Sequence, residues 1–207
     1  MNAAVKEVDP QLFFAEEDVA RAEHYAVLSR LFASAPDAAF LSKLPALARV
    51  WGNPETPLGE AWLELGQAAA QVDAIAAEEE YTRLFLTIGR PEVMLFGSFY
   101  LAGFLMEEPL VELRSDLAEL GLGRRQGVSE SEDHLSALCD VMRHLVLTAP
   151  DAAGLARQKA FFGQHLAPWC EALCDSLQQA PDARFYPHTA PLVRAFFAVE
   201  RQAFDMI

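Results

Sequence analysis

The spacing of hydrophobic residues along the chain is that of amphipathic α-helices. Apolar positions recur every three or four residues through most of the 207 residues, and no run alternates with the period of two that strands require. Together with helix-start and helix-stop residues, the pattern predicts helices over residues 16–35, 37–48, 58–76, 78–89, 108–120, 129–146, 152–179 and 189–204. We therefore predict an all-α fold, a globular multi-helix domain with seven to eight or more helices.

Helix-breaking residues divide this pattern. Residues 51–57 contain a glycine and two prolines and predict a loop, while Pro168 predicts a kink in the helix that contains it. Residues 91–106 are the least polar part of the chain, and their glycines favour an extended or broken segment. Residues 1–15 are predicted to form a flexible N-terminal segment, and residues 16–207 a single helical domain.

A helix start is encoded at Ser129. Ser129 and Glu132 form a potential capping box, and the acidic residues around them complement the positive end of the helix dipole. The apolar face that follows consists of Leu135, Leu138, Met142, Leu145 and Val146. The pattern thus predicts that Asp133 and His134 lie in the first turn, where a carboxylate and an imidazole can stand beside an apolar groove.

Charge narrows the range of partners. The 30 acidic residues outnumber the 16 basic ones and give a formal net charge of -14. This balance argues against nucleic acid and is compatible with a basic peptide or protein, although an acidic surface also serves solubility alone. Residues 1–10 lack the apolar stretch of a signal peptide, and no uncharged run reaches the length of a membrane span. These features predict a soluble, cytoplasmic protein.

The motifs of common enzymes and metal sites are missing. The sequence has no phosphate-binding loop, no zinc-protease helix motif, no nucleophile elbow and no dinucleotide fingerprint. Cys139, Cys170 and Cys174 are odd in number and lie in helical patterns, which predicts packing roles instead of disulfides or a metal site. We therefore expect no catalysis, no metal and no cofactor.

Two groups of residues have both a structural and a functional interpretation. Asp133 and His134 either complement a helix end or place an acceptor and a switchable donor at the rim of a peptide site. Tyr81, Leu84 and Phe85 either belong to the core or line such a site. Spacing alone leaves both interpretations open.

Several motifs together resemble the TorD/DmsD family of redox-enzyme maturation chaperones. They are Tyr25-x-x-Leu-x-x-Leu-Phe-x-x-x-Pro36, Tyr81-x-x-Leu-Phe-x-x-x-Gly89, Gly97-Ser-Phe-Tyr-Leu101, Glu130-Ser-Glu-Asp-His134, His165-Leu-Ala-Pro-Trp169 and Phe185-Tyr186. The resemblance implies a TorD-like helical fold, occurring as a monomer or a domain-swapped dimer. It also implies a chaperone that binds the twin-arginine signal peptide of a molybdoenzyme subunit in the cytoplasm, delays its export and favours insertion of the molybdopterin cofactor.

The same resemblance implies a peptide-binding site. Matching the motifs assigns contacts to Tyr81, Leu84, Gly97, Asp133 and His134.

We further hypothesise that Asp133 takes the cationic end of the peptide, with Glu79, Glu80 or Glu130 on the rim, because Arg pairs well with carboxylates. Leu84, Phe85 and Phe99 would then contact its apolar segment. Two alternatives stay open: an assembly scaffold that binds folded enzyme, and a metal-dependent hydrolase that uses Asp133 and His134.

Overall fold

Ten α-helices and one 3₁₀ turn account for the regular structure of the described residues in this computed structural model. It describes residues 15–86, 91–105, 107–124, 127, 130–149 and 151–207. The helices are α1 (Glu16–Ala33), α2 (Ala38–Trp51), α3 (Pro57–Gln71), α4 (Ala74–Phe85), α5 (Gly97–Ala102), α6 (Glu108–Glu119), α7 (Leu135–Thr148), α8 (Ala152–His165), α9 (Cys170–Gln178) and α10 (Thr189–Asp205), with the 3₁₀ turn over Tyr186–His188. Within the described ranges there is no strand, which confirms the all-α prediction. The flexible segment predicted for residues 1–15 lies outside these ranges except for Ala15.

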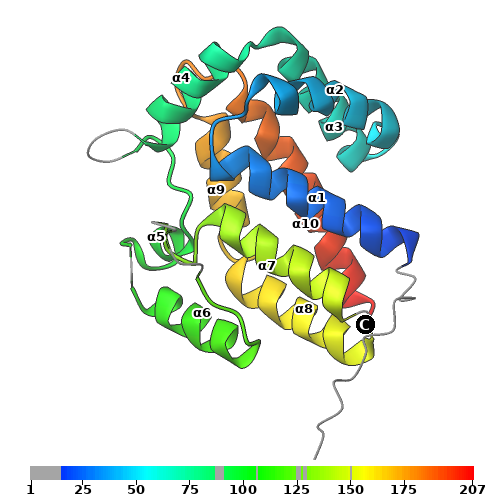
Figure 1. The fold of residues 1–207 in the computed structure, drawn as a ribbon, viewed down its shortest axis with the longest axis vertical. Coiled ribbons are helices and arrows are strands. Elements are labelled where there is room, and N and C mark those ends of the chain that lie inside the picture. Colours follow the sequence, from blue (N-terminus) through cyan, green and yellow to red (C-terminus); the bar gives the residue numbers. More distant parts are fainter. Residues whose placement is uncertain (1–14, 87–90, 106, 125–126, 128–129, 150) are drawn as a thin grey trace, which may run out of the picture.

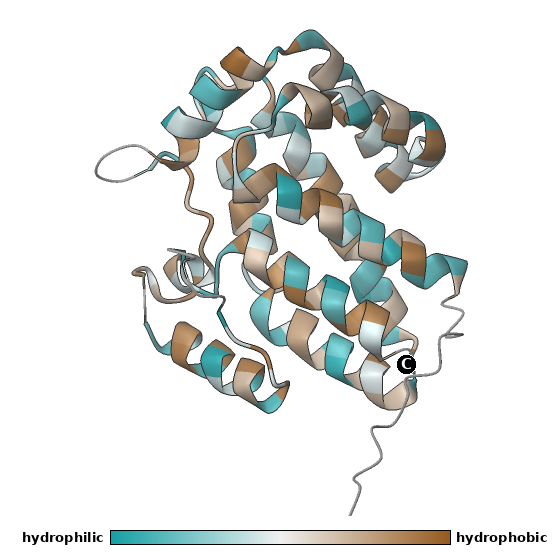
Figure 2. Cartoon of the chain, in the orientation of Figure 1, coloured by the Kyte–Doolittle hydropathy of each residue, from teal (hydrophilic) through white to brown (hydrophobic). Residues whose placement is uncertain are grey.

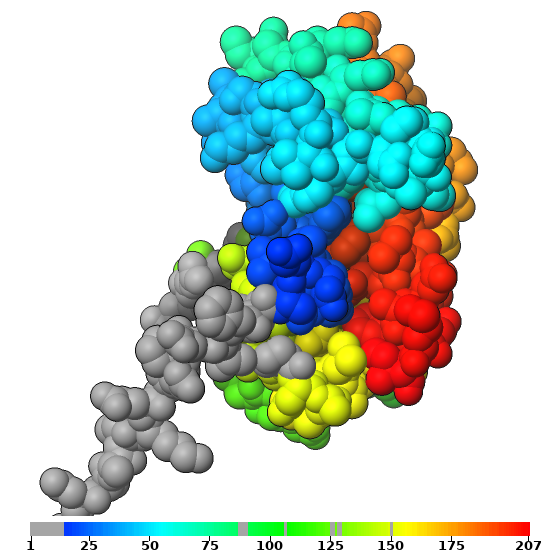
Figure 3. Space-filling model, turned by 90° about the vertical axis from the view of Figure 1, so that its right-hand side faces the viewer, coloured from blue at the N-terminus to red at the C-terminus, as the bar shows by residue number. Residues whose placement is uncertain are grey.

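Helix α1 crosses the middle of the molecule, and the other helices are arranged around it (Figure 1). It packs along α7, while α2 and α3 form an antiparallel pair at one end, and α10 runs past α3 and α9. Figure 3 shows α1 between that pair and α8, with α10 alongside. Helices α5 and α6 lie to one side of α7 and α8 (Figure 1).

The core forms where the apolar stripes of these helices meet (Figure 2). Tyr25, Leu31 and Phe32 of α1 are fully buried, as are Met142 of α7 and Val193 of α10. Burying each large apolar side chain stabilises the fold by roughly 1.5–3 kcal/mol, so the central helix is held mainly by this packing.

Buried polar groups fix α1 against α10. The Glu200 carboxylate is fully buried and accepts hydrogen bonds from Arg21 Nε at 2.6 Å, Arg21 Nη2 at 2.9 Å and the Tyr25 hydroxyl at 2.8 Å. Arg21 Nη2 also donates to Gln158 Oε1 of α8 at 2.9 Å. A buried carboxylate is tolerated because every oxygen has a charged or polar partner.

Local capping explains several helix starts, and it corrects one prediction. Asp37 caps α2 by accepting from Phe40 N at 2.7 Å, which is typical of an aspartate directly before an apolar helical stripe. Asp73 caps α4 by accepting from Ala76 N at 2.8 Å. The helix predicted over 58–76 therefore ends early, at Gln71, and the next one begins at Ala74 instead of residue 78. That helix ends at Phe85, and its predicted end at Gly89 lies outside the described residues.

The helix predicted to start at Ser129 begins six residues later. Leu135 is the first residue of α7 and His134 is its N-cap, while Ser129 lies outside the described residues. The backbone of Asp133 and His134, directly before α7, is extended because it pairs with another segment of the chain. Gly97 N donates to Asp133 O at 3.0 Å, and Leu135 N donates to Leu95 O at 2.8 Å. Asp133 and His134 thus belong to an extended entry segment and not to a first turn.

The segment that contains glycines is broken, as predicted, whereas the helix predicted over 152–179 is two helices. Residues 91–96 are non-helical, and the short helix α5 follows them. The predicted kink at Pro168 is a full break between α8 and α9, where Trp169 Nε1 donates to His165 O at 2.7 Å.

Candidate functional site

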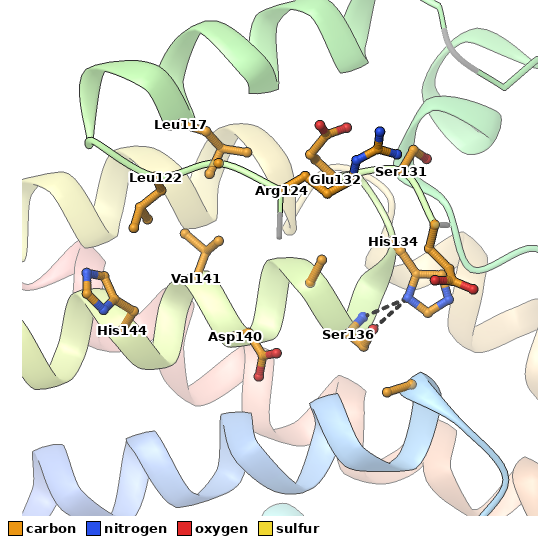
Figure 4. A pocket seen from close by; sticks show the side chains of 14 residues that line it. Leu117, Leu122, Arg124, Ser131, Glu132, His134, Ser136, Asp140, Val141 and His144 are labelled. Atoms are coloured by element: carbon orange, nitrogen blue, oxygen red, sulfur yellow. Dashed lines mark hydrogen bonds between the residues drawn. The ribbon is translucent and has the colours of Figure 1, made fainter. Parts of the chain in front are cut away.

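Two cavities meet beside the entry to α7. The larger, about 500 Å³, lies between α6 and α7; the smaller, about 100 Å³, lies at the C-terminal ends of α1 and α4. Ala33, Glu130 and His134 line both. The larger cavity, shown in Figure 4, is also lined by Leu117, Leu122, Gly123, Arg124, Ser131, Glu132, Ser136, Ala137, Asp140, Val141 and His144. The smaller is also lined by Tyr81, Phe85, Leu86, Pro91, Val93, Met94, Leu95 and Phe96.

A short backbone pairing builds the wall between the cavities. Phe96 and His134 form an isolated antiparallel β-bridge, closed by the two hydrogen bonds that join residues 95–97 to residues 133–135. The rings of Phe96 and His134 lie edge to face, with centroids 5.0 Å apart. Val93 N also donates to Leu84 O at 3.0 Å, so the extended segment is tied to the end of α4 as well.

His134 stands at the junction as a neutral imidazole. Burial lowers its pKa to about 4, despite the opposing effect of the Glu130 and Asp133 carboxylates. Its Nδ1 accepts from Ser136 N at 3.2 Å and lies 2.7 Å from Ser136 Oγ. Because Nδ1 is the acceptor that caps α7, the proton of the neutral ring sits on Nε2. The ring can therefore offer an N–H donor.

Asp133, predicted as a contact for a cationic group, lines neither cavity. It is 3% exposed, and its oxygens accept from Ser98 N at 2.9 Å, from Ser98 Oγ at 2.5 Å and from Ser131 Oγ at 2.5 Å. With both oxygens engaged, this carboxylate anchors the start of α5 to the entry of α7. Its place in the structure corrects the hypothesis that it meets a basic group directly.

The residues predicted on α4 separate into two groups. Tyr81 and Phe85 line the smaller cavity, although most of each side chain is in the core. The Tyr81 hydroxyl donates to Phe32 O at 3.0 Å, and burial raises the pKa of Tyr81 to about 12. Leu84 is completely buried and lines neither cavity. Glu80, predicted on the rim, is also buried.

Glu80 has a structural role. Its carboxylate accepts from the backbone N–H groups of Arg184, Phe185 and Tyr186 at 2.7–3.2 Å. It thereby fixes the turn before α10 to α4 and is not available at a rim.

The remaining predicted residues lie next to the site without lining it. A Cβ on Gly97 would sit 3.0 Å from Trp169 Nε1, so the glycine permits α5 to approach the α8–α9 break. Phe99 is half-buried and packs edge to face against Tyr100, with centroids 5.2 Å apart.

The larger cavity includes residues that the sequence prediction omitted. Ala137, Val141 and His144 recur at four and three residues along α7 and all line the cavity. Figure 4 shows Val141 and His144 on the side of α7 that faces Leu117 and Leu122. They form a second stripe beside the buried face of the helix. Val141 is apolar but does not belong to the predicted stripe of buried residues on this helix. An apolar residue at such a position was the sequence signal that could have revealed the groove.

Charged groups line one side of the larger cavity. Arg114 donates to Glu132 Oε2 through Nε at 3.0 Å and Nη2 at 2.9 Å. Burial opposes ionisation of Glu132, but these hydrogen bonds and the nearby arginines lower its pKa overall. Glu130 and Asp140 add two exposed carboxylates to the lining.

The described residues hold no group of three or more His, Cys, Asp or Glu side chains that could bind a metal ion. Cys139, Cys170 and Cys174 are buried free thiols. Nor does any helix in the described ranges have the length and apolar character needed to cross a membrane.

Fold and site define an all-helical protein with a partly apolar, partly acidic groove of a size that accepts a peptide segment. The model of the nitrate reductase delta subunit family matches residues 53–175, more than half of the chain, and the chain belongs to this family. The TorD-like character expected from the motifs is confirmed by this family match and by the relatives described next.

Named relatives agree with this placement. The chain is 28% identical over 134 residues to the chaperone protein TorD of Vibrio cholerae serotype O1, covering 61% of each protein. It is 25% identical over 126 residues to TorD of Photobacterium profundum, covering 56% of this chain and 58% of that protein. The match thus spans about three fifths of these relatives.

A solved structure shares the fold. The crystal structure of a protein from Archaeoglobus fulgidus, named as a redox enzyme maturation protein, superposes with a TM-score of 0.55 at 20% identity, covering 95% of this chain and 99% of that one.

Proposed function

We propose that this protein binds the twin-arginine signal peptide, the apo form, or both, of a molybdopterin-containing oxidoreductase subunit. It acts in the cytoplasm, assists insertion of the cofactor and holds the subunit back from export until it is mature. The observation that carries the proposal is the groove of about 500 Å³ between α6 and α7, which joins a second cavity at His134 in a member of this family.

The lining suits a segment that is basic at one end and apolar along its length. Leu117, Leu122 and Val141 supply apolar surface, and Glu130 and Asp140 supply carboxylates. Apolar burial sets the residence time of such a complex, while the carboxylates speed the encounter of an acidic protein with a basic peptide.

The predicted site residues take two kinds of role in this proposal. His134 donates from Nε2 to a peptide carbonyl, and Tyr81 and Phe85 contact the peptide from the smaller cavity. Leu84, Gly97, Phe99 and Asp133 position the walls, because they lie behind or beside the lining residues. The protein acts by binding, as the name chaperone of its relatives implies, and requires no cofactor of its own.

The test is a fluorescence anisotropy titration with labelled leader peptides from the twin-arginine molybdoenzymes encoded in the same genome. One peptide is expected to bind with a Kd of about 1 µM, weakened by raising the salt concentration. Val141→Asp places a charge in the apolar groove and should weaken this binding at least ~10-fold.

Val111→Asp is the matched control. Val111 is an exposed valine on α6 that does not line the groove, so this variant should bind like the wild type. Equal binding by the wild type and Val141→Asp would remove the groove from the proposal. If neither a leader nor the apo subunit binds, but the folded enzyme does, the protein is an assembly scaffold.

A further inference from the structure

A second groove lies on another part of the surface, between α3 and α10. Its volume is about 350 Å³, and it shares no lining residue with the two cavities beside α7. Figure 3 shows α3 and α10 on the same face of the molecule, where the two helices pack together. The lining consists of Pro57, Glu60, Ala61 and Glu64 of α3 and of Pro191, Arg194, Ala195 and Ala198 of α10. This groove is therefore a separate site from the one proposed for the leader.

The small side chains along the groove suit it to a helix. Ala61, Ala195 and Ala198 present only methyl groups, so the axis of a third helix can approach to the roughly 8–10 Å of close helix packing. An added strand would find no free edge, because the backbone groups of α3 and α10 are hydrogen-bonded within each helix beyond its first turn. The walls thus favour a helix laid along the groove.

The wall formed by α3 carries two carboxylates without a cationic partner. Glu60 and Glu64 are exposed and lie four residues apart on one side of α3. Neither forms an ion pair with any residue in the described part of the chain. Glu60 complements the positive end of α3, but Glu64 lies a turn further along. Because like charges at this spacing destabilise a helix, a cation placed between the two carboxylates would stabilise α3.

The cation in the lining, Arg194, is already paired. Its Nε donates to Glu171 Oε2 at 2.8 Å and its Nη2 to Asp175 Oδ1 at 2.9 Å, both on α9. Arg201, the next arginine on this side of α10, does not line the groove. The N-terminal ends of α3 and α10 also reach the groove, and each adds a positive charge of about half an elementary charge. The four carboxylates outweigh this positive charge, so the groove favours a basic partner.

The charge also argues against two other occupants. A second copy of this chain would bring the same carboxylates, and the same formal net charge of -14, to the contact. Nucleic acid would place phosphates against the carboxylates. The occupant that fits both the shape and the charge is a basic, amphipathic helix of another protein.

We infer that the groove between α3 and α10 holds an α-helix on the body of the client subunit. Small or apolar side chains of that helix lie against Ala195 and Ala198, and two of its basic side chains, four residues apart, pair with Glu60 and Glu64. This inference rests on the proposed function for its partner, and it adds a second contact outside the groove that receives the leader. Two contacts with one subunit raise the effective concentration of each for the other, so the subunit stays bound by its body when its leader is briefly released.

Binding of apo subunits expressed without their leaders tests this surface. Surface plasmon resonance is recorded with the molybdoenzyme subunits encoded in the same genome, and the doubly substituted variant Glu60→Lys/Glu64→Lys should bind its subunit at least ~10-fold more weakly than the wild type. The matched control is Glu108→Lys/Glu112→Lys on α6. These glutamates are also exposed and four residues apart, the first of them also lies in a first helical turn, and neither lines a cavity described above.

The control should weaken binding less than ~2-fold. Both double variants change the net charge equally, so a difference between them reports the groove and not the overall charge. Ala198→Trp fills the groove without changing the charge and should weaken binding at least ~10-fold, because Ala198 is an exposed lining residue. A benzophenone side chain at the same position should cross-link to a helix with basic residues four apart, and a cross-link to a segment without basic residues would contradict the inference.

The outcomes separate this inference from the proposed function. The two double variants should bind a leader peptide equally, because neither changes a residue that lines the leader groove. If a leader binds but no leaderless subunit does, or if the wild type and both double variants bind the leaderless subunit equally, the inference is overturned while leader binding stands. If no leader binds, but a leaderless subunit binds and is lost in Glu60→Lys/Glu64→Lys, the second surface stands and leader binding is removed from the proposed function.

Discussion

Acidification should destabilise the fold through His134. The imidazole caps α7 as a neutral acceptor, and its pKa is about 4 when folded against 6.5 for the free side chain. The unfolded chain therefore binds the extra proton first, so stability is complete above pH 6.5 and falls as pH drops from 6.5 to 4. The full difference corresponds to about 3 kcal/mol, and about 2 kcal/mol should already be lost at pH 5.

The measurement is urea unfolding of the wild type and of His134→Asn at pH 7.5, 6.5, 5.5 and 5.0. Asparagine also caps helices but does not titrate in this range, and His24, whose pKa burial also lowers, is present in both proteins. The wild type should lose about 2 kcal/mol more than the variant between pH 7.5 and 5.0. Parallel pH profiles for the two proteins would refute the neutral, capping imidazole.

Two further substitutions test the buried polar groups by urea unfolding at pH 7.5. Glu200→Ala leaves the Arg21 guanidinium without its buried partner and should lower the free energy of unfolding by roughly 3–5 kcal/mol. A decrease below about 1 kcal/mol would mean that Arg21 reaches water in the variant. Asp133→Ala removes the acceptor of both Ser98 donors and should lower the free energy of unfolding by roughly 2 kcal/mol. Ser98→Ala keeps the carboxylate and should lower it by less. The reverse order would contradict the anchoring role of Asp133.

The sequence predicted those features that local interactions determine. Asp37 caps α2 because an aspartate before an apolar helical stripe satisfies the first N–H groups by itself. The capping signal at Ser129 is equally good locally, yet the chain there pairs with residues 95–97 instead. That pairing joins segments more than thirty residues apart, and no local pattern records it.

The same distinction explains the candidate site. Motif matching identified Tyr81 and His134, and the peptide hypothesis added Phe85; all three line the smaller cavity. It could not separate them from Leu84 and Asp133, because an apolar helical position or a carboxylate before a helix has the same sequence signal whether it faces a groove or the core. The packing of α4 against α1 decides which α4 side chains face the cavity, and the hydrogen bonds from Ser98 and Ser131 decide where Asp133 lies.

The Arg21–Glu200 contact also has a consequence for the order of folding. The two residues are 179 positions apart, so Arg21 of the central helix, whose local ion pair is with Asp18, obtains its buried partner only after nearly the whole chain has been synthesised. Until then Arg21 remains hydrated, and α1 can pack only against segments made earlier, such as α7. Final closure of the core is thus a late event, and a ribosome-bound chain that lacks α10 should be much more sensitive to protease than the released protein.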